Sequence, residues 1–180
     1  MSKQPLVDPL PHLKSLAAAV RLEGQPEATF RVLDAAMKGV IGHKLMTVLI
    51  YHEVLQETER FYSSNLEAYP IAGRKRVRAT SWTEQLLIGQ NCYIGNNAAD
   101  IRRFFLDHEL IHSLGCDAIL NVPVVWNGVT LGTCNLMHEE DWYDEGDTGI
   151  AMTIASVAAP AYLQVWGKGG LEDGLSKSMK

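Results

Sequence analysis

The sequence predicts an α+β fold in which an antiparallel sheet carries the terminal helices on one face. Two strand-like runs, 118–126 and 129–138, are separated by Asn127-Gly128, a dipeptide that favours a two-residue hairpin turn. Helical stretches with apolar residues three and four positions apart lie at both ends of the chain. Shorter helical stretches lie between the first strands and the hairpin, which completes the α+β order.

Two helices are expected before the first strand. Residues 12–22 combine leucines with an alanine run and end near Gly24, a residue that commonly follows a helix. A second helix starts at Pro26, because a proline ring is tolerated in the first turn, where its missing N–H would be unpaired anyway. The apolar stripe of this second helix consists of Phe30, Leu33, Met37 and Val40.

Two strands and a loop are expected next. Residues 45–51 form a short, continuous apolar run rich in β-branched side chains, which indicates a buried strand. Residues 58–63 alternate so that Arg60 and Tyr62 share one face, as in a second strand paired with the first. The basic run within 74–78 is expected to be a solvated loop.

Short helices and one short strand are expected in the middle of the chain. Ser81 and Asp100 are candidate N-caps, since their side-chain oxygens can accept from the first free backbone N–H groups of a helix. A further helical stretch covers 107–114 and stops at Gly115. Residues 92–94 form a short strand candidate.

The hairpin should have two chemically different faces. With its turn at the Asn-Gly dipeptide, Trp126 faces Val129, and strict alternation then fixes every other pair. In this register Asn121 lies directly across from Cys134, on a face that mixes apolar and polar side chains. The opposite face is almost entirely apolar. We therefore expect the apolar face to pack on helices and the mixed face to border a site that needs polar contacts.

A long helix is expected to close the domain. Asp144 or Asp147 caps it, and Pro160 must bend or interrupt it because proline removes a helix hydrogen bond. We expect three segments: an N-terminal lead and helix at 1–25, the domain itself at 26–166, and a flexible tail at 167–180.

Composition excludes several classes of function. The chain has 180 residues, with 16 Lys+Arg and 21 Asp+Glu, and its net charge of −5 argues against nucleic acid as a partner. No stretch approaches the ~18 consecutive apolar residues of a membrane helix, and the N-terminus lacks a secretory pattern. The 3 cysteines have no CxxC spacing, which fits reduced thiols and predicts a cytoplasmic protein.

A zinc site is one candidate. The run at 108–112, HELIH, matches the HExxH pattern in which two histidines on one helical face bind zinc and the glutamate acts as general base. The extended form of this motif places a third ligand three residues beyond Gly115, where this chain has Ala118. A zinc hydrolase is therefore the least favoured of three candidate functions, and we expect no bound metal.

Thiol chemistry is a second candidate. A reactive cysteine needs a lowered pKa, which a nearby cation or a helix N-terminus provides. Cys116 follows the C-terminal end of an expected helix, whose negative end disfavours the thiolate. Cys134 is expected to line a pocket without reacting, and Cys92 to be buried and inert.

The hairpin region resembles the closing hairpin of GAF domains. The similarity rests on residues 114–124, which end in Val-Pro-Val, on the Asn-Gly turn, and on residues 131–136, which begin Leu-Gly. Residues 61–65 look like the end of the family's second strand, and the resemblance extends over about 26–165. It implies a six-stranded antiparallel sheet with the N- and C-terminal helices on one face and short helices covering a small-molecule pocket on the other.

The resemblance implies a ligand-binding sensor or regulatory domain that acts without a fused output domain. It would bind an unidentified small molecule, with no cofactor, and form a homodimer through its terminal helices. The alternative is a thiol enzyme resembling free methionine-(R)-sulfoxide reductases, with Cys116 and Cys134 as the catalytic candidates. The expected ligand-binding residues are Tyr62, Ser64, Trp82, Asp100, Phe104, His108, Asn121 and Cys134.

Overall fold

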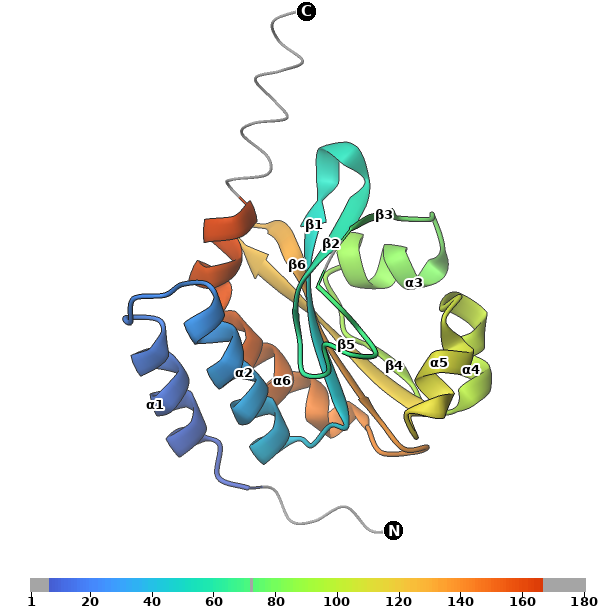
Figure 1. The fold of residues 1–180 in the computed structure, drawn as a ribbon, viewed down its shortest axis with the longest axis horizontal. Helices are drawn as coiled ribbons and strands as arrows, with labels where there is room; N and C mark the ends of the chain where they lie inside the picture. Colours follow the sequence, from blue (N-terminus) through green and yellow to red (C-terminus); the bar gives the residue numbers. More distant parts are fainter. Residues whose placement is uncertain (1–6, 72, 167–180) are drawn as a thin grey trace, which may run out of the picture.

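The computed structural model of the chain describes residues 7–71 and 73–166, and the predicted tail at 167–180 lies outside them. Within the described residues a six-stranded antiparallel sheet has the order β3-β2-β1-β6-β5-β4, which confirms the predicted fold class (Figure 1). The strands are β1 (Leu45–His52), β2 (Glu57–Ser63), β3 (Arg74–Arg76), β4 (Tyr93–Gly95), β5 (Ala118–Trp126) and β6 (Val129–His138).

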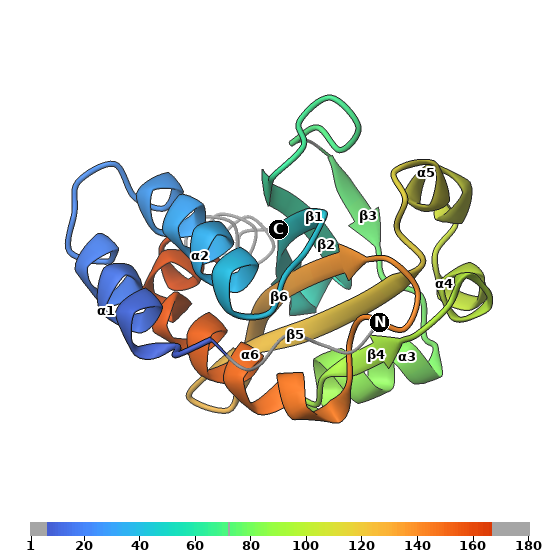
Figure 2. The same cartoon turned by 90° about the horizontal axis from the view of Figure 1, so that it is seen from below.

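Helices cover both faces of this sheet. The long helices α1, α2 and α6 lie together on one side, and the short helices α3, α4 and α5 lie on the other (Figures 1 and 2). Two further turns, η1 and η2, follow β1 and α3. The bounds are α1 (Leu10–Ala19), α2 (Glu27–Val40), η1 (Glu53–Leu55), α3 (Ser81–Thr83), η2 (Glu84–Ile88), α4 (Ala98–Phe104), α5 (His108–Ser113) and α6 (Glu145–Val157).

The main core lies between the sheet and the long helices. Phe30, Leu33 and Met37 of the predicted α2 stripe are buried there, Val40 is partly buried, and α1 adds the fully buried Leu16. The Phe30 ring meets Tyr162 edge to face, with 5.2 Å between centroids. Each such fully buried apolar side chain stabilises the fold by about 1.5–3 kcal/mol relative to an exposed one. This core holds the central strands β1, β5 and β6 in place.

The closing helix begins and bends where the sequence predicts. Asp144 is the N-cap of α6, and its carboxylate accepts from the Gly146 N–H at 2.7 Å. Asp147 completes a capping box by accepting from the Asp144 N–H at 3.0 Å. After α6, a second helical segment at Ala159–Trp166 is turned by 57°, around Pro160. Among the described residues no single helix has the length and apolarity to cross a membrane. This bent pair, taken together, reaches that length and apolarity, by length and composition only.

A β-bulge in β6 changes the predicted faces of the hairpin. Its turn residues both have positive φ, 50° at Asn127 and 76° at Gly128, as a type I′ turn requires. Val124 pairs with Gly132 while the next residue of β5 pairs with Thr130, so Leu131 is an extra residue in β6. Beyond the bulge, each residue of β5 therefore pairs with the β6 residue one position later in the sequence than predicted.

The prediction that Cys134 faces Asn121 is therefore wrong. Beyond the bulge, Asn121 pairs with Asn135, and Cys134 pairs with Val122. Cys134 and Val122 both belong to the core under the long helices, on the side of the sheet opposite to the two asparagines.

A second bulge, in β2, separates two residues that alternation had placed together. Val48 pairs with Tyr62, but Leu49 pairs with Arg60, so Phe61 is the extra residue. Tyr62 consequently turns toward α2, where its hydroxyl donates to the Asp34 carboxylate at 2.5 Å. Arg60 turns to the opposite face of the sheet.

The basic run and two helix caps also differ from the prediction. Residues 74–76 form the edge strand β3, not a loop, because Arg74 and Arg76 lie opposite glutamates of β2. Arg74 forms an ion pair with Glu59 at 3.1 Å. The N-caps of α3 and α4 are Thr80 and Asn97, each one to three residues before the predicted Ser81 and Asp100.

We predict that Gly132→Ala strongly destabilises the fold. A Cβ at this position would lie 2.0 Å from the backbone oxygen of Leu49, which the paired strand cannot relieve by a side-chain rotation. We expect a loss of about 2–3 kcal/mol in the free energy of unfolding, measured by urea denaturation. Gly149→Ala, in the exposed part of α6 with open space around it, is the matched control and should add roughly 0.5–1 kcal/mol. Equal stabilities of the two variants would contradict the strand pairing.

Candidate functional site

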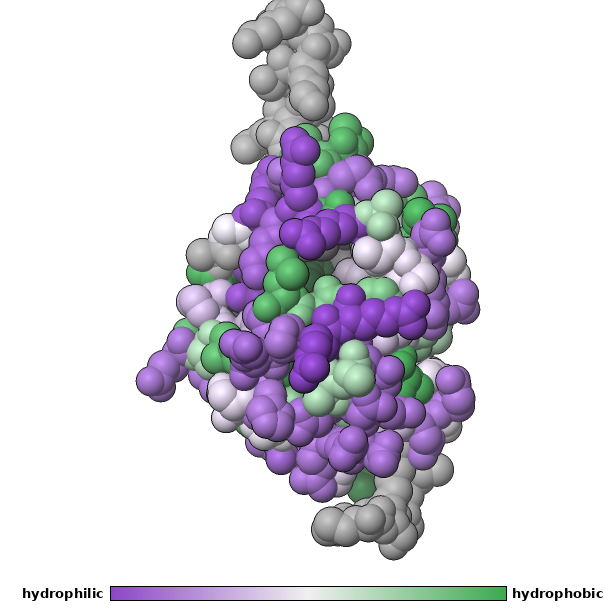
Figure 3. All heavy atoms as spheres, turned by 90° about the vertical axis from the view of Figure 1, so that its right-hand side faces the viewer, coloured by the Kyte–Doolittle hydropathy of each residue, from purple (hydrophilic) through white to green (hydrophobic). Residues whose placement is uncertain are grey.

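A cavity of about 310 Å³ opens on the face of the sheet opposite to the long helices. Its floor is formed by β1, β5 and β6, and its sides by β2, β3 and the segments of α3, α4 and α5. Figure 3 shows this side of the molecule, where long hydrophilic side chains surround a hollow with apolar surface inside it. The volume is at the lower end of the range for small-molecule sites.

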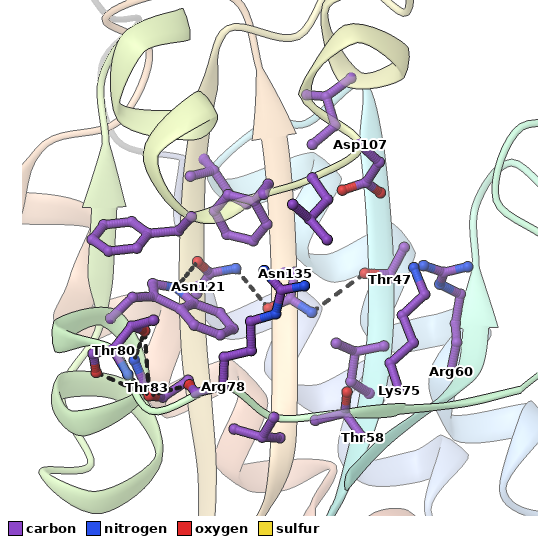
Figure 4. Close-up of a pocket in the computed structure, with 18 of the residues that line it drawn as sticks. Thr47, Thr58, Arg60, Lys75, Arg78, Thr80, Thr83, Asp107, Asn121 and Asn135 are labelled. Carbon is purple, nitrogen blue, oxygen red and sulfur yellow. Dashed lines mark hydrogen bonds between the residues drawn. The ribbon is translucent and has the colours of Figure 1, made fainter.

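The floor of the cavity carries a chain of buried polar side chains. The Trp82 indole N–H donates to Asn121 Oδ1 at 2.9 Å, and Asn121 Nδ2 donates to Asn135 Oδ1 at 2.7 Å (Figure 4). Asn135 Nδ2 then donates to Thr47 Oγ1 at 3.3 Å. Asn121 and Asn135 are only 1% and 4% exposed, so these bonds offset the cost of burying two amides.

The indole fixes the direction of this chain. An indole N–H can only donate, so it turns the carbonyl of Asn121 toward Trp82, and each following amide is oriented in turn. Within the described residues, each amide keeps one N–H without a partner, and the Thr47 hydroxyl keeps its hydrogen. The floor therefore offers mainly hydrogen-bond donors to a ligand.

The walls of the cavity are apolar. Trp82 and Phe105 meet edge to face, with 5.3 Å between centroids, and close one side. The apolar lining residues are Leu49, Val77, Trp82, Phe104, Phe105, Leu106, Ile111, Ile119 and Met137. Such a combination of apolar walls and a few oriented polar groups is typical of sites that bind small organic molecules.

Basic side chains dominate the charge around the cavity. Asp107 is the acidic residue among its described lining residues, and it accepts a hydrogen bond from the Tyr69 hydroxyl at 2.7 Å. Arg60 lies over the Tyr69 ring, 4.7 Å from its centroid, and its burial lowers the pKa of the guanidinium. The basic lining residues are Arg60, Lys75, Arg76, Arg78, Arg102 and Arg103.

Three of the predicted ligand-binding residues line this cavity together. Trp82 comes from α3, Phe104 from the end of α4, and Asn121 from β5. Tyr62 and Cys134 lie on the other face of the sheet because of the two bulges described above.

The remaining three predicted residues lie outside the cavity. Ser64 borders a separate hollow beside Asp34 and His43, and its hydroxyl accepts from the Met46 N–H at 2.8 Å. Asp100 accepts from the backbone N–H of Asn96 at 2.9 Å, within its own helix start. His108 begins α5 but does not line the cavity, whereas the preceding Asp107 does.

Sequence reasoning missed the rest of the polar lining. Asn135 and Thr47 complete the amide chain, and Arg60, Lys75 and Arg78 border it (Figure 4). The glycine at 132, within a strand pattern, is the one signal for the bulge that brings Asn135 onto this face. The sequence shows the basic run at 74–78, but it gives no sign that residues 74–76 form an edge strand.

The cysteines lie away from the cavity and are protonated. Cys116 and Cys134 are 1% and 0% exposed, and neither they nor Cys92 is among the lining residues. Burial raises the pKa of Cys92 and Cys116 to about 11, and that of Cys134 further. A thiolate nucleophile is disfavoured at all three positions.

The HELIH run does not assemble a metal site in the described part of the chain. No group of three His, Cys, Asp or Glu side chains there is arranged to hold an ion. His112 Nδ1 instead lies 2.7 Å from Asp117 Oδ1, with the imidazole 71% exposed. The helix α5 spans only His108–Ser113.

Solved structures with the same fold include several GAF domains. The GAF domain of a phosphoenolpyruvate-protein phosphotransferase from Coxiella burnetii superposes with a TM-score of 0.69 at 15% identity, covering 89% of this chain and 96% of that one. The GAF domain of a two-component sensor histidine kinase from Bacillus halodurans gives 0.61 at 10% identity, covering 77% and 95%. Free methionine-R-sulfoxide reductase from Neisseria meningitidis, in complex with its substrate, gives 0.65 at 13% identity, covering 90% and 96%.

These likenesses establish that the chain has the GAF-domain fold, as its hairpin motifs imply. No protein-family model matches the sequence, and no curated protein matches it. At these identities the fold is shared, whereas the chemistry of the site has to be argued from its own side chains.

We predict that the folded protein is nearly inert to thiol reagents. A pKa raised from 9.0 to about 11 lowers the thiolate fraction at pH 8 by about a hundredfold for Cys92 and Cys116. Cys134 should react more slowly still, because it is fully buried. The rate of labelling with a chromogenic disulfide, compared with the same protein in guanidinium, measures this. A cysteine that reacts in the folded state as fast as in the unfolded state would revive thiol catalysis.

Proposed function

We propose that this chain is a regulatory domain that binds a small molecule in the cavity over β1, β5 and β6. The observation that supports this most is the buried amide chain from Trp82 to Thr47 at the floor of an open, apolar-walled hollow. A core that served only for stability would gain more from apolar side chains at these positions, because buried amides need every bond satisfied.

The lining favours binding over catalysis. A general acid or base needs a pKa near the working pH, and histidine and cysteine are the usual nucleophiles and bases at neutral pH. The described lining residues include neither. Their ionisable groups are arginines, one lysine, Asp107 and Tyr69, and burial and the Asp107 hydrogen bond raise the pKa of Tyr69 further from neutrality. We therefore place the sensor function before the thiol enzyme.

The sheet gives such a domain a route for its output. Asn121 and Asn135 face the cavity, while their neighbours Val122 and Leu136 face the core under the long helices. A ligand that shifts β5 or β6 therefore acts directly on the packing of α2 and α6. We include in the proposal a homodimer through the terminal helices as the receiver of that shift. The cytoplasmic location stays a prediction.

A variant that fills the cavity tests this function. Thr58 lines the cavity and is only half-buried, so Thr58→Trp should occupy part of the space without disrupting the sheet. In a thermal-shift screen of a metabolite library, at least one compound should raise the Tm of the natural chain, because a ligand specific to the folded state stabilises it. The same compound should have little effect on Thr58→Trp.

Val54→Trp, at an exposed position of η1 outside both the cavity and the terminal helices, is the matched control and should respond like the natural chain. Equal stabilisation of both tryptophan variants would place the ligand elsewhere. A library without any stabilising compound, together with native mass spectra free of a co-purified molecule, would contradict the function itself.

A further inference from the structure

We propose that the ligand of this cavity is a small organic anion with at least two negative charges and an apolar body. The inference rests on the proposed function and adds the chemical class of its ligand. It follows from the charges at the mouth, from the absence of ion pairs for three of them among the described residues, and from the donors on the floor.

The charge around the cavity is opposite to that of the chain. Six of its 16 Lys and Arg residues line the cavity, against one of its 21 Asp and Glu residues, although an even distribution would place more carboxylates there than cations. The excess comes from β2, β3, the segment before α3, and α4, so four separate segments bring positive charge to one opening. A concave site lined by one sign of charge attracts ligands of the other sign.

Three of these cations form no ion pair in the part of the chain that the structure describes. Lys75, Arg78 and Arg102 form no ion pair with any residue in the described ranges, whereas Arg74, adjacent to Lys75 on β3, pairs with Glu59. Because side chains alternate along β3, Arg74 lies beside a glutamate, whereas Lys75 lies at the mouth of the cavity beside Thr58. The edge strand presents unpaired charge where a ligand would enter.

Two of the arginines are held in place by local contacts. Arg60 Nη1 donates to the backbone oxygen of Pro70 at 3.1 Å, and its guanidinium lies over the Tyr69 ring. Its Nε is buried and makes no hydrogen bond with a described residue. The backbone of Arg78 is fixed by the Thr83 hydroxyl, which donates to its oxygen at 2.9 Å. In Figure 4 the Arg78 side chain extends toward Asn135.

The floor and the mouth select the same chemistry. The amide N–H groups, the Thr47 hydroxyl and the guanidinium groups all donate, so a ligand must supply several acceptor oxygens. Carboxylate and phosphate groups both provide these oxygens and pair with arginine in a bidentate way. The walls around Trp82 and Phe105 require an apolar body behind the charged groups.

Two matched pairs of probes test the inference on the full chain. Benzene-1,3-dicarboxylate is compared with benzene-1,3-dicarboxamide, and phenyl phosphate with phenol, by calorimetric titration at low ionic strength. At least one anion should bind at least about tenfold more tightly than its neutral partner, and its affinity should fall as salt is added. The pair that responds distinguishes a carboxylate ligand from a phosphate ligand, and either result supports the proposal.

Variants link the effect to the cavity. Arg78→Gln should weaken binding of the anion by about tenfold, and Lys75→Gln should weaken it as well. If one of the two variants folds poorly, the other still tests the proposal. Arg21→Gln, an exposed position outside the cavity, is the matched control and should bind like the natural chain. Unfolding curves of the free variants verify that each is folded.

Three outcomes would overturn the inference. Neutral probes, or neutral compounds from the library screen, that bind as tightly as anions and lose binding in Thr58→Trp would refute the anion class and leave the proposed function standing. An anion that binds the Arg78→Gln and Lys75→Gln variants as tightly as the natural chain would also refute the anion class and leave the proposed function standing. If no probe and no library compound binds, the proposed function fails together with the inference.

Discussion

The hydrogen bond between Asn121 and Asn135 links the register of the sheet to the chemistry of the site. These amides face each other across the central hairpin at 2.7 Å, while the next pair along it, Val122 and Cys134, packs under the long helices. A slip of one residue would bury the amides in the apolar core and expose the core residues to the cavity, at a cost of several kcal/mol for the unpaired polar groups. The polar floor and the apolar core therefore specify the same register.

Much of this fold was predictable from local patterns. The hairpin at 118–126 and 129–138, its turn, and the Asp144 cap follow from residue types whose backbone preferences are strong. Alternation failed where one extra residue enters a strand, at Phe61 and at Leu131. Each bulge exchanged the faces of the residues beyond it, which is why Tyr62 and Cys134 were misplaced.

The site itself was only partly predictable, for a related reason. Trp82, Phe104 and Asn121 were anticipated because aromatic and amide side chains near a mixed sheet face suit a ligand pocket. The cations were seen as a run but not as part of a site, since their role depends on β3 pairing with β2, which three residue pairs establish. Long-range pairing of so short a strand leaves almost no local signal. Arg60 shares a predicted face with Tyr62, but the bulge at Phe61 separates the two, and only Arg60 lines the cavity.

The edge position of β3 has a consequence for how this domain can diverge. The amide donors on the floor belong to β5 and β6, the two longest strands, where Gly132 permits contact with β1 and tolerates no larger side chain. Lys75 instead stands on a peripheral ribbon of three residues, open to solvent. Descendants of this chain can therefore exchange the charge at the entrance by single substitutions while the interior is conserved, and acquire new effectors without rebuilding the scaffold.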